Sequence, residues 1–399
     1  MIHFDKSIEI LHSLKIDEPK TKTVYLMDAC GYVSAEDIVA DHNSPDVPTS
    51  AMDGYAVLYE DMSLERLCII GTNPAGMVPQ IEVIGGTCVK TFTGSLMPHG
   101  ADTLIPIENV EVQEDEIVIK EPVEKGYAVR KVGEIYAKGE LLIATGTVIE
   151  FPQIGVLASL NISEIQVYEK PKVAILSTGS ELLALGEEQT SYAQIRSSNN
   201  YVLEAIVQKY GGEALQLGCI RDDKETIKRE IDKALMQSDI VVATGGVSVG
   251  DFDFVKDVIY ELGYDVVFKG VRVKPGQHIM VARKGDKFII GLPGFAYSAT
   301  VTALLYLVPI MEKLQYRPSA MRIVKATVKE AFHKRAKKAE FTACNISLVR
   351  GKYYVDFKGK KVGTSAILTN MLGSAALLVT SEEEGSKDAG DEVNVLLWD

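Results

Sequence analysis

The chain has 399 residues, enough for two to four domains that each bury a core of their own. Its formal net charge of −13 argues against a general binder of nucleic acid or of anionic membranes, although a local pocket can still take a small anion. No apolar run is long enough to span a membrane, and the first residues do not have the pattern of a signal peptide. We therefore expect a cytoplasmic protein that has neither nucleic acid nor a membrane as a partner.

The cysteines are few and scattered. Their number is odd, and no two of them form a C-x-x-C pair. They are Cys30, Cys68, Cys88, Cys219 and Cys344. This usage predicts reduced, mostly buried thiols rather than a disulfide framework or a zinc site.

The N-terminal part of the chain is mixed in character. Residues 4–16 place apolar side chains on one face at helical spacing. Residues 41–140 consist of short apolar runs separated by Gly, Pro and Asn, which predicts a β-rich segment. A further helix is expected to begin at Pro152.

The pattern changes at Pro171, where strands begin to alternate with helices for about 140 residues. This alternation predicts a doubly wound, mostly parallel sheet, and residues beyond Pro318 return to strands and turns. We predict an elongated, multidomain protein of the α/β plus β class. Its parts are an N-terminal helical and linker domain (1–40 and 141–168), a β-rich arm (41–140), an α/β domain (169–317) and a small C-terminal β domain (318–399).

One carboxylate stands out in the arm. Asp53 interrupts the apolar run AMDGYAVL and is followed directly by Gly54. An Asp among apolar side chains costs several kcal/mol unless it is hydrogen-bonded or holds a cation. Two readings stay open: a turn residue that accepts bonds from local backbone amides, and a carboxylate that serves a site.

Three strands of the predicted α/β domain end in glycine-containing turns, STGSEL, TGGVSVGDFD and GLPG. Each turn alone is a weak signal, because strand-to-helix turns often need glycine for geometry. Together, with carboxylates just past the glycines of the first two, they favour a site for phosphate and a metal ion. Neither a Walker A lysine pattern nor a G-x-G-x-x-G spacing is present.

These motifs resemble those of a known family. PTSAMDGYAV resembles the signature of the molybdopterin molybdenumtransferase family, which includes MoeA and the gephyrin E domain, and the glycine turns, the KPG loop at Lys274 and FTG…PHGAD resemble further family motifs. The resemblance runs from near residue 5 to the end of the chain. It implies a molybdopterin-binding (MogA-like) α/β domain, a dimeric active site and insertion of molybdenum from molybdate into adenylylated molybdopterin, with release of AMP. A molybdopterin adenylyltransferase would then be the upstream donor.

The resemblance also implies residue roles. Glu181 and Asp253 are expected to bind Mg²⁺ together. Asp53, Thr93, Lys274 and Asp223 are the expected catalytic residues, although Asp222 and Asp223 also suit the start of a helix and Lys274 also suits a solvated loop. Twelve residues are expected to bind substrate: Ser177, Thr178, Gly179, Thr244, Gly245, Gly246, Ser248, Pro275, Gly276, Pro293, Gly294 and Ser298.

The chain departs from the family pattern mostly on the expected molybdate side. Ile135 stands where an acid is usual, Phe295 and Ala296 replace the end of GLPGNP, and Ala343 replaces the arginine of an FxR motif. These departures keep two alternatives open: a paralogue that binds the pterin or its nucleotide as a carrier or scaffold, and an adenylyltransferase. The AMDGYA segment and the C-terminal β domain count against the second. The sequence does not distinguish molybdate from tungstate or identify the recipient apo-enzymes.

Overall fold

The computed structural model describes residues 1–246, 254–361 and 365–398. Its contacts separate two compact units. The first contains Met1–Glu36, Thr145–Ile154 and Ser163–Asp399, and the second contains Asp37–Ala144 and Gly155–Ile162. Across the described ranges, no helix is both long and apolar enough to cross a membrane. The four-part division made from the sequence stays a prediction.

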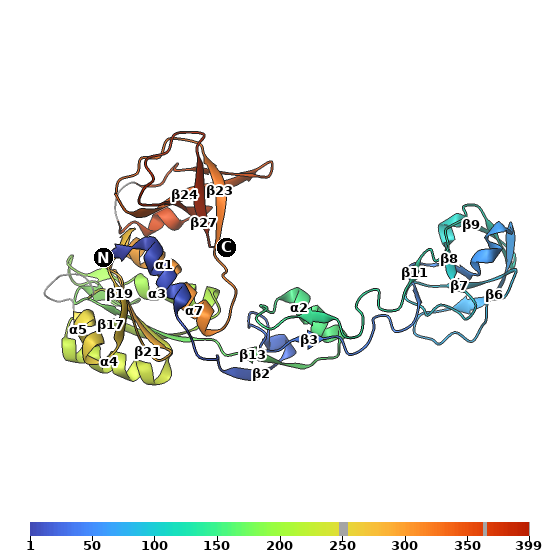
Figure 1. Ribbon diagram of the computed structural model, residues 1–399, viewed down its shortest axis with the longest axis horizontal. Helices are drawn as coiled ribbons and strands as arrows, with labels where there is room; N and C mark the ends of the chain where they lie inside the picture. The colour runs from blue at the N-terminus through green and yellow to red at the C-terminus, as the bar shows by residue number, and fades with distance from the viewer. Residues whose placement is uncertain (247–253, 362–364, 399) are drawn as a thin grey trace. The chain divides into compact units, whose positions relative to one another are not determined.

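A six-stranded sheet forms the centre of the first unit (Figure 1). Four neighbouring strands run parallel, and the last two continue the sheet antiparallel, which confirms the doubly wound class. In spatial order the strands are β17 (Glu213–Ile220), β14 (Lys172–Thr178), β18 (Ile240–Thr244), β22 (Lys287–Leu292), β21 (Met280–Lys284) and β19 (Asp265–Lys269).

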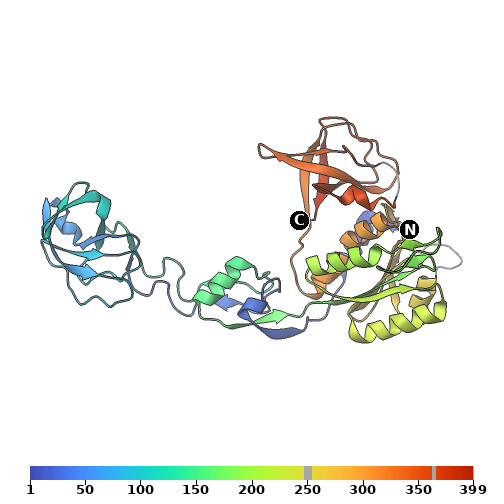
Figure 2. The ribbon, with the colours of Figure 1, turned by 180° about the vertical axis from the view of Figure 1, so that it is seen from behind.

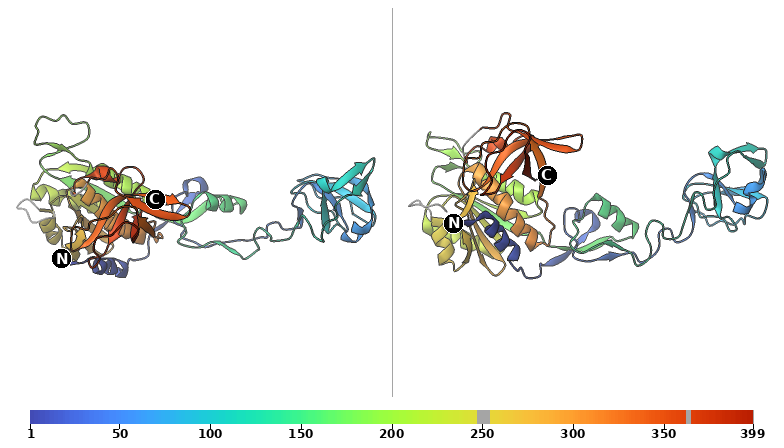
Figure 3. Two further views of the ribbon diagram at one scale, coloured as in Figure 1. Left: turned by 90° about the horizontal axis from the view of Figure 1, so that it is seen from above. Right: turned by 45° about the horizontal axis from the view of Figure 1, so that its top comes forward.

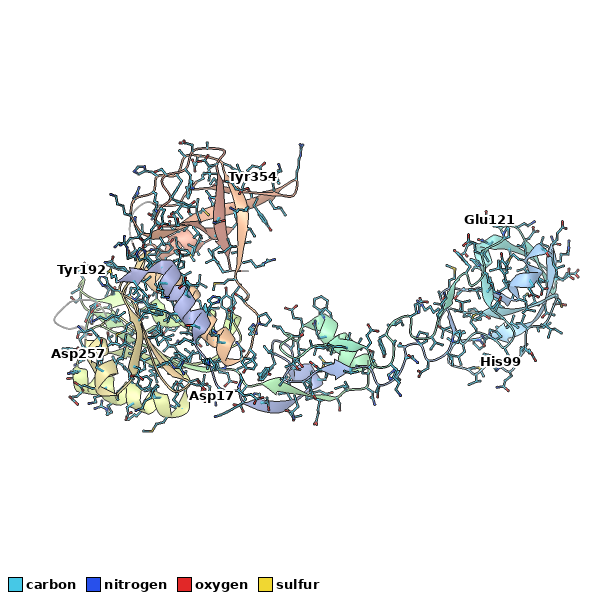
Figure 4. The ribbon with its side chains drawn as sticks, in the orientation of Figure 1. Asp17, His99, Glu121, Tyr192, Asp257 and Tyr354 are labelled. Atoms are coloured by element: carbon cyan, nitrogen blue, oxygen red, sulfur yellow. The ribbon has the colours of Figure 1, made fainter. Side chains whose placement is uncertain are left out.

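Helices cover both faces of this sheet (Figure 2). Along β14, Val173 and Ile175 pack in the core that includes α1, α3, α6 and α7, whereas Ala174 and Leu176 pack with α4 and α5. A strand buried on both faces therefore reads as a continuous apolar run. The helices are α1 (Phe4–Ser13), α3 (Asn199–Lys209), α4 (Lys224–Gln237), α5 (Phe254–Glu261, which carries the Asp257 labelled in Figure 4), α6 (Ala296–Thr302) and α7 (Val308–Leu314).

The helical segment that follows GLPG is not uniform. A π-helical segment, Ala303–Leu307, lies between α6 and α7. Pro309 follows directly in the first turn of α7 and has no backbone N–H to give to the preceding turn. The local widening is the usual accommodation of such a break.

The segment DVVFKGVRV (265–273) has the apolar pattern of a single strand but is divided into two. Gly270 has φ +69° and separates β19 from β20 (Val271–Lys274). The Gly270 N–H donates to Ile279 O, and its carbonyl accepts from Ile2 N. β19 stays in the doubly wound sheet, while β20 pairs with β1 (Ile2–His3) and β24 (Ala339–Val349) in another sheet.

The C-terminal strands close on themselves. In the seven-stranded sheet β1-β20-β24-β25-β23-β27-β26, the long strand β24 also pairs with β26, so the last five strands form a ring. Tyr354, labelled in Figure 4, lies on β25. The remaining bounds are β25 (Lys352–Asp356), β23 (Arg322–Val328), β27 (Glu392–Leu397), β26 (Ala375–Thr380) and the 3₁₀ turn η5 (Leu368–Met371).

Short elements complete the first unit. β2 (Thr21–Tyr25) pairs antiparallel with β13 (Glu164–Tyr168), and the 3₁₀ turn η1 spans Leu26–Asp28. In the doubly wound domain, β15 (Leu182–Leu183) and β16 (Ile195–Arg196) frame a loop that extends away from the sheet (Figure 3). α2 (Phe151–Ser159) contains residues of both units.

The second unit is built on a six-stranded sheet of order β8-β5-β7-β6-β10-β9. Its core contains Tyr55, Val57 and Ile105. The bounds are β8 (Thr103–Pro106), β5 (Gly54–Val57), β7 (Thr87–Thr91), β6 (Arg66–Asn73), β10 (Glu116–Ile119), β9 (Val110–Gln113), the 3₁₀ turns η2 (Tyr59–Ser63) and η3 (Ile107–Asn109), and the pairs β4 (Thr49–Ser50) with β11 (Val129–Arg130) and β3 (Ile38–Val39) with β12 (Leu141–Ile143).

The cysteines are all free, but the expectation that most are buried is wrong. Only Cys88 and Cys344 are buried, and each lies on a central strand of a β core. Cys30 and Cys68 are exposed. Burial raises the pKa of the Cys88 and Cys344 thiols to about 12, so these two stay protonated at neutral pH.

Gly54 is a position where the backbone of the second unit tolerates no side chain. A Cβ there would lie 2.3 Å from Ile105 O on the neighbouring strand β8. We expect Gly54→Ala to destabilise this unit by about 3 kcal/mol, because the two strands must move apart. Hydrogen exchange of β5, β7 and β8 measures the effect. Gly85→Ala is the matched control, since a Cβ there has nothing within 4 Å; equal protection in both variants would contradict the steric argument.

Candidate functional site

A cavity of about 660 Å³ lies where β14, β18 and β22 end. Each of the three glycine turns contributes to its wall, as the sequence predicted for the carboxyl ends of parallel strands. The residues that both line this cavity and were expected to bind substrate are Thr178, Gly179, Thr244, Gly245, Gly246, Pro293 and Gly294.

The turn after β18 requires glycine. Gly245 has φ +87°, and a Cβ there would lie 2.7 Å from Thr178 O. The two turns therefore touch backbone to backbone. Thr178 Oγ1 lies against the same glycines, is buried and has no hydrogen-bond partner in the described part of the chain.

A second buried hydroxyl without a described partner is Ser197 Oγ, which also belongs to the cavity lining. Buried hydroxyls are nearly always bonded in proteins. Both hydroxyl oxygens are buried within the cavity wall, and Ser197 lies beside the Cys219 thiol. Ser197 was not among the predicted site residues; it lies between β16 and α3, at the start of the segment SSNNYVLEA.

The network behind the cavity wall is complete. Ser177 Oγ donates to Asn200 Oδ1 at 2.5 Å and lies 2.7 Å from Thr244 Oγ1, and Ser177 is fully buried. Asn199 Nδ2 donates to Gly294 O at 2.8 Å, so the start of α3 holds the GLPG turn. Ser177 therefore supports the wall from behind. Asn199 was missed because a polar residue at a helix start looks like an ordinary cap.

Carboxylates reach this cavity from two loops. Glu181 and Asp222 both line it, and Asp222 also accepts a bond from Ser180 N at 3.2 Å. Asp223 is the N-cap of α4 and accepts from Thr226 N at 2.9 Å, which lowers the pKa of its carboxyl. Its predicted catalytic role stays a prediction, and of the two neighbouring aspartates it is Asp222 that lies at the cavity.

Several predicted residues lie elsewhere. Ser248 and Asp253 fall outside the described residues. Ser298 is buried in α6, and its N–H donates to Ser365 O at 3.1 Å. Gly276 packs against α6, since a Cβ there would lie 2.2 Å from Thr302 Cγ2.

A second cavity, of about 430 Å³, lies between the KPG loop and the C-terminal strands. Lys274, Pro275, Tyr297 and the β24 residues Glu340–Ala343 line it. Its remaining ionisable lining residues are mostly basic: His333, Arg335, Lys360 and Lys361, with Glu330 as the other acid. The cavity thus carries more positive than negative groups on a protein that is acidic overall.

The two cavities are neighbours. Ala296 lines the first and Tyr297 the second, and the same is true of Ala366 and Ser365. Tyr297 is fixed between them: its hydroxyl donates to Phe341 O at 3.0 Å and accepts from Ala343 N at 2.9 Å. Burial raises the pKa of this phenol, so it stays protonated.

The cationic side chains of the second cavity differ in whether they have a partner within the protein. Lys274 Nζ lies 3.2 Å from Glu340 Oε1. Lys360 Nζ donates to the carbonyls of Asn370 and Leu372, and burial lowers its pKa. For the side chains of Arg335 and Lys361, the described part of the chain provides no hydrogen bond or ion pair. These two are the cations most available to a ligand.

The departures from the family pattern divide between the cavities. Phe295 and Ala296 line the first cavity, and Phe295 is 64 % exposed. Ala343 lines the second, where no long side chain competes for space. Ile135 belongs to the second unit and is exposed. The absence of a basic residue at position 343 therefore affects only the second cavity.

Asp53 is exposed rather than enclosed by its apolar neighbours. Its Oδ1 accepts from Thr93 N at 2.8 Å and from Thr93 Oγ1 at 2.7 Å. These bonds, and then Lys90, lower the pKa of the Asp53 carboxyl, so it is ionised at neutral pH. Asp53 also lines a cavity of about 280 Å³ with Lys90, Phe92 and Ile107. The structure thus brings Asp53 and Thr93 together, across forty residues of sequence.

Comparison with known proteins covers the same regions. Residues 2–161 match the MoeA N-terminal region (domains I and II), residues 174–313 a probable molybdopterin-binding domain, and residues 325–398 the MoeA C-terminal region (domain IV). The fold and the cavity at the glycine turns thus define a protein of the MoeA class.

Whole-chain relatives agree. The molybdopterin molybdenumtransferase of Nostoc sp. is 31 % identical over 96 % of this chain and 90 % of that protein, and that of Haemophilus influenzae is 30 % identical over 94 % and 93 %. Two crystal structures of the Pyrococcus horikoshii molybdopterin biosynthesis MoeA protein have TM-scores of 0.84 and 0.79 at 29 % and 30 % identity, covering 100 % of this chain and at least 99 % of theirs. The chain belongs to the molybdopterin molybdenumtransferase family.

The aspartate pair at α4 gives a direct test of placement. Asp223→Ala removes the cap of α4, so we expect the melting temperature to fall by a few degrees. Asp222→Ala is the matched comparison: it leaves the cap intact and removes an exposed bond from Ser180 N, so it should lower the melting temperature less. Thermal unfolding followed by circular dichroism measures both. A melting temperature that falls only in the Asp222 variant would reverse the assignment.

Proposed function

We propose that this chain inserts molybdenum from molybdate into adenylylated molybdopterin and releases AMP. The observation that supports this most directly is the pair of neighbouring cavities that share the first turn of α6. One is lined by glycine turns and carboxylates, which suits a nucleotide-linked pterin. The other is rich in lysine and arginine, which suits an oxyanion.

The first cavity has the groups that a phosphate linkage needs. Gly245 and Gly246 lie in a turn of positive φ, an arrangement that can bind anions. The Gly245 N–H already donates to Leu292 O at 3.1 Å, so the Gly246 amide is the one proposed to contact the phosphate. Glu181 and Asp222 supply hard oxygen ligands beside this turn. Magnesium prefers one or two carboxylates together with phosphate oxygens.

We propose that Mg²⁺ binds at these carboxylates, with Asp253 as a further expected ligand. No cluster of three or more His, Cys, Asp or Glu exists in the described ranges, so phosphate oxygens would have to complete the site. The bound ion would offset the charge of the adenylate. The protein groups do the rest: the Gly246 amide contacts the linkage, and the bond from Asn199 to Gly294 O keeps the wall rigid.

The second cavity is proposed to bind molybdate. Lys274, Arg335 and Lys361 bring positive charge from three separate segments. Because the side chains of Arg335 and Lys361 have no partner in the described part of the chain, they can replace the charge that Ala343 lacks. We therefore favour the inserting enzyme over the carrier alternative, which requires this side to be non-functional.

Asp53 and Thr93 are proposed to act in the reaction from a second subunit of a homodimer. The Asp53 carboxylate is ionised, is held by two donors of Thr93 and keeps Oδ2 for another proton donor. Such a carboxylate can orient a water molecule by accepting a hydrogen bond from it, and its fixed charge can stabilise positive charge that develops during the reaction. A molybdopterin adenylyltransferase is the expected supplier of the adenylylated substrate.

The activity is tested by incubating the purified protein with adenylylated molybdopterin, molybdate and Mg²⁺ and measuring AMP. We expect AMP release to require both ions. Glu181→Ala should weaken Mg²⁺-dependent nucleotide binding at least about tenfold, since a charged ligand contact is lost. Tight nucleotide binding with no AMP release under any condition would support the carrier instead.

The shared site is tested by mixing inactive variants. Asp53→Asn keeps size and removes charge, so AMP release should fall at least about a hundredfold while the melting temperature stays within a few degrees. When Asp53→Asn and Glu181→Ala subunits are exchanged in equal amounts, roughly a quarter of wild-type activity should return, because mixed dimers contain one intact site. No recovery despite proven exchange would mean that each subunit uses its own Asp53.

A further inference from the structure

We propose that Glu340 is a selectivity residue of the second cavity: it holds Lys274 and disfavours oxyanions that carry no proton. The inference rests on the proposed function only in that the cavity binds an oxyanion. Glu340 belongs to no motif that pointed to the family. Its role follows from its position and its partners.

Glu340 and Lys274 are fixed as neighbours by the backbone. β20 pairs in parallel with β24, which is labelled in Figure 1. This register places Lys274 opposite Glu340. Lys274 is the last residue of β20, directly before the turn that begins at Pro275. The ion pair of 3.2 Å therefore does not depend on a flexible loop. The strand ladder holds both side chains at the cavity wall.

The Glu340 carboxylate is immobilised as well. The residue is 5 % exposed. Its Oε1 accepts from Lys274 Nζ and from Thr342 Oγ1 at 3.4 Å, and its Oε2 accepts from Arg335 N at 3.2 Å. A carboxylate has about four lone-pair positions, so about one is left on Oε2 for a ligand.

A fixed carboxylate changes what this cavity selects. An oxyanion without a proton, such as molybdate or sulfate, is repelled by Glu340 and must compete with it for Lys274. Hydrogen phosphate has nearly the same shape and charge as sulfate but keeps one O–H at neutral pH. That O–H can donate to the remaining lone pair, so the same carboxylate that repels sulfate bonds hydrogen phosphate.

The consequence for the proposed reaction is a built-in limit on molybdate affinity. Lys274 is already paired, and Arg335 and Lys361 are the unpaired cations. Free molybdate should therefore bind weakly, and inorganic phosphate should compete with it. A purely structural role for Glu340, as a link between β20 and β24, predicts no such preference among anions.

The test measures binding of molybdate, sulfate and inorganic phosphate to the full-length protein by calorimetry. In the wild type we expect phosphate to bind at least about fivefold more tightly than sulfate. Glu340→Gln keeps the shape and removes the charge, so molybdate and sulfate should bind about tenfold more tightly and phosphate little changed. In Lys274→Met, all three should weaken, and adding Glu340→Gln should restore part of the molybdate and sulfate affinity, because the repulsion is removed.

The outcomes separate the two proposals. If no anion binds, or if Lys274→Met binds all three like the wild type, the second cavity is not the oxyanion site and the proposed function is in doubt. If Lys274 is needed but sulfate and phosphate bind equally in the wild type, the Glu340 inference alone is wrong. This comparison needs no Glu340 variant, so it holds even if Glu340→Gln fails to fold. A folded Glu340→Gln protein that binds molybdate more weakly would also overturn the inference.

Discussion

The pairing of β20 with β24 is the constraint on which the candidate site depends. At Gly270 the chain leaves the doubly wound sheet, and β20 becomes a strand of the sheet that contains the C-terminal ring. The KPG loop at its end is thereby held between α6 and β24. Without that change of sheet, the glycine-turn cavity would have no lysine-rich neighbour, and the first turn of α6 would border a single pocket.

Sequence reasoning worked well where one physical pattern dominates. Strands such as β14 are buried on both faces, so their apolar runs are continuous and the helices between them have clear periods. The meeting of the glycine turns at one site could be predicted as well, because parallel strands end at the same edge of a sheet. Gly245 shows why these turns need glycine: its positive φ and its close approach to Thr178 O leave no room for a side chain.

The sequence was less informative where function depends on contacts between distant segments. Nothing in DVVFKGVRV distinguishes one strand from two strands of different sheets; the break depends on bonds from Gly270 to Ile2 and Ile279. Asp222 and Asp223 are chemically identical neighbours, and only the capping bond to Thr226 separates them. Arg335 and Lys361 look like ordinary surface cations until the fold turns them toward one cavity.

The two proposed sites share one feature, a carboxylate that is held beside a basic side chain. Asp53 is held ionised by Thr93, and Glu340 is held by three donors beside Lys274. In each, hydrogen bonds fix a carboxylate near a lysine, Lys90 for Asp53 and Lys274 for Glu340. A site made only of cations would bind every small oxyanion present in a cell and release none of them readily. Fixed carboxylates reduce that attraction, and they let the proton on a ligand, rather than its total charge, determine which anion is retained.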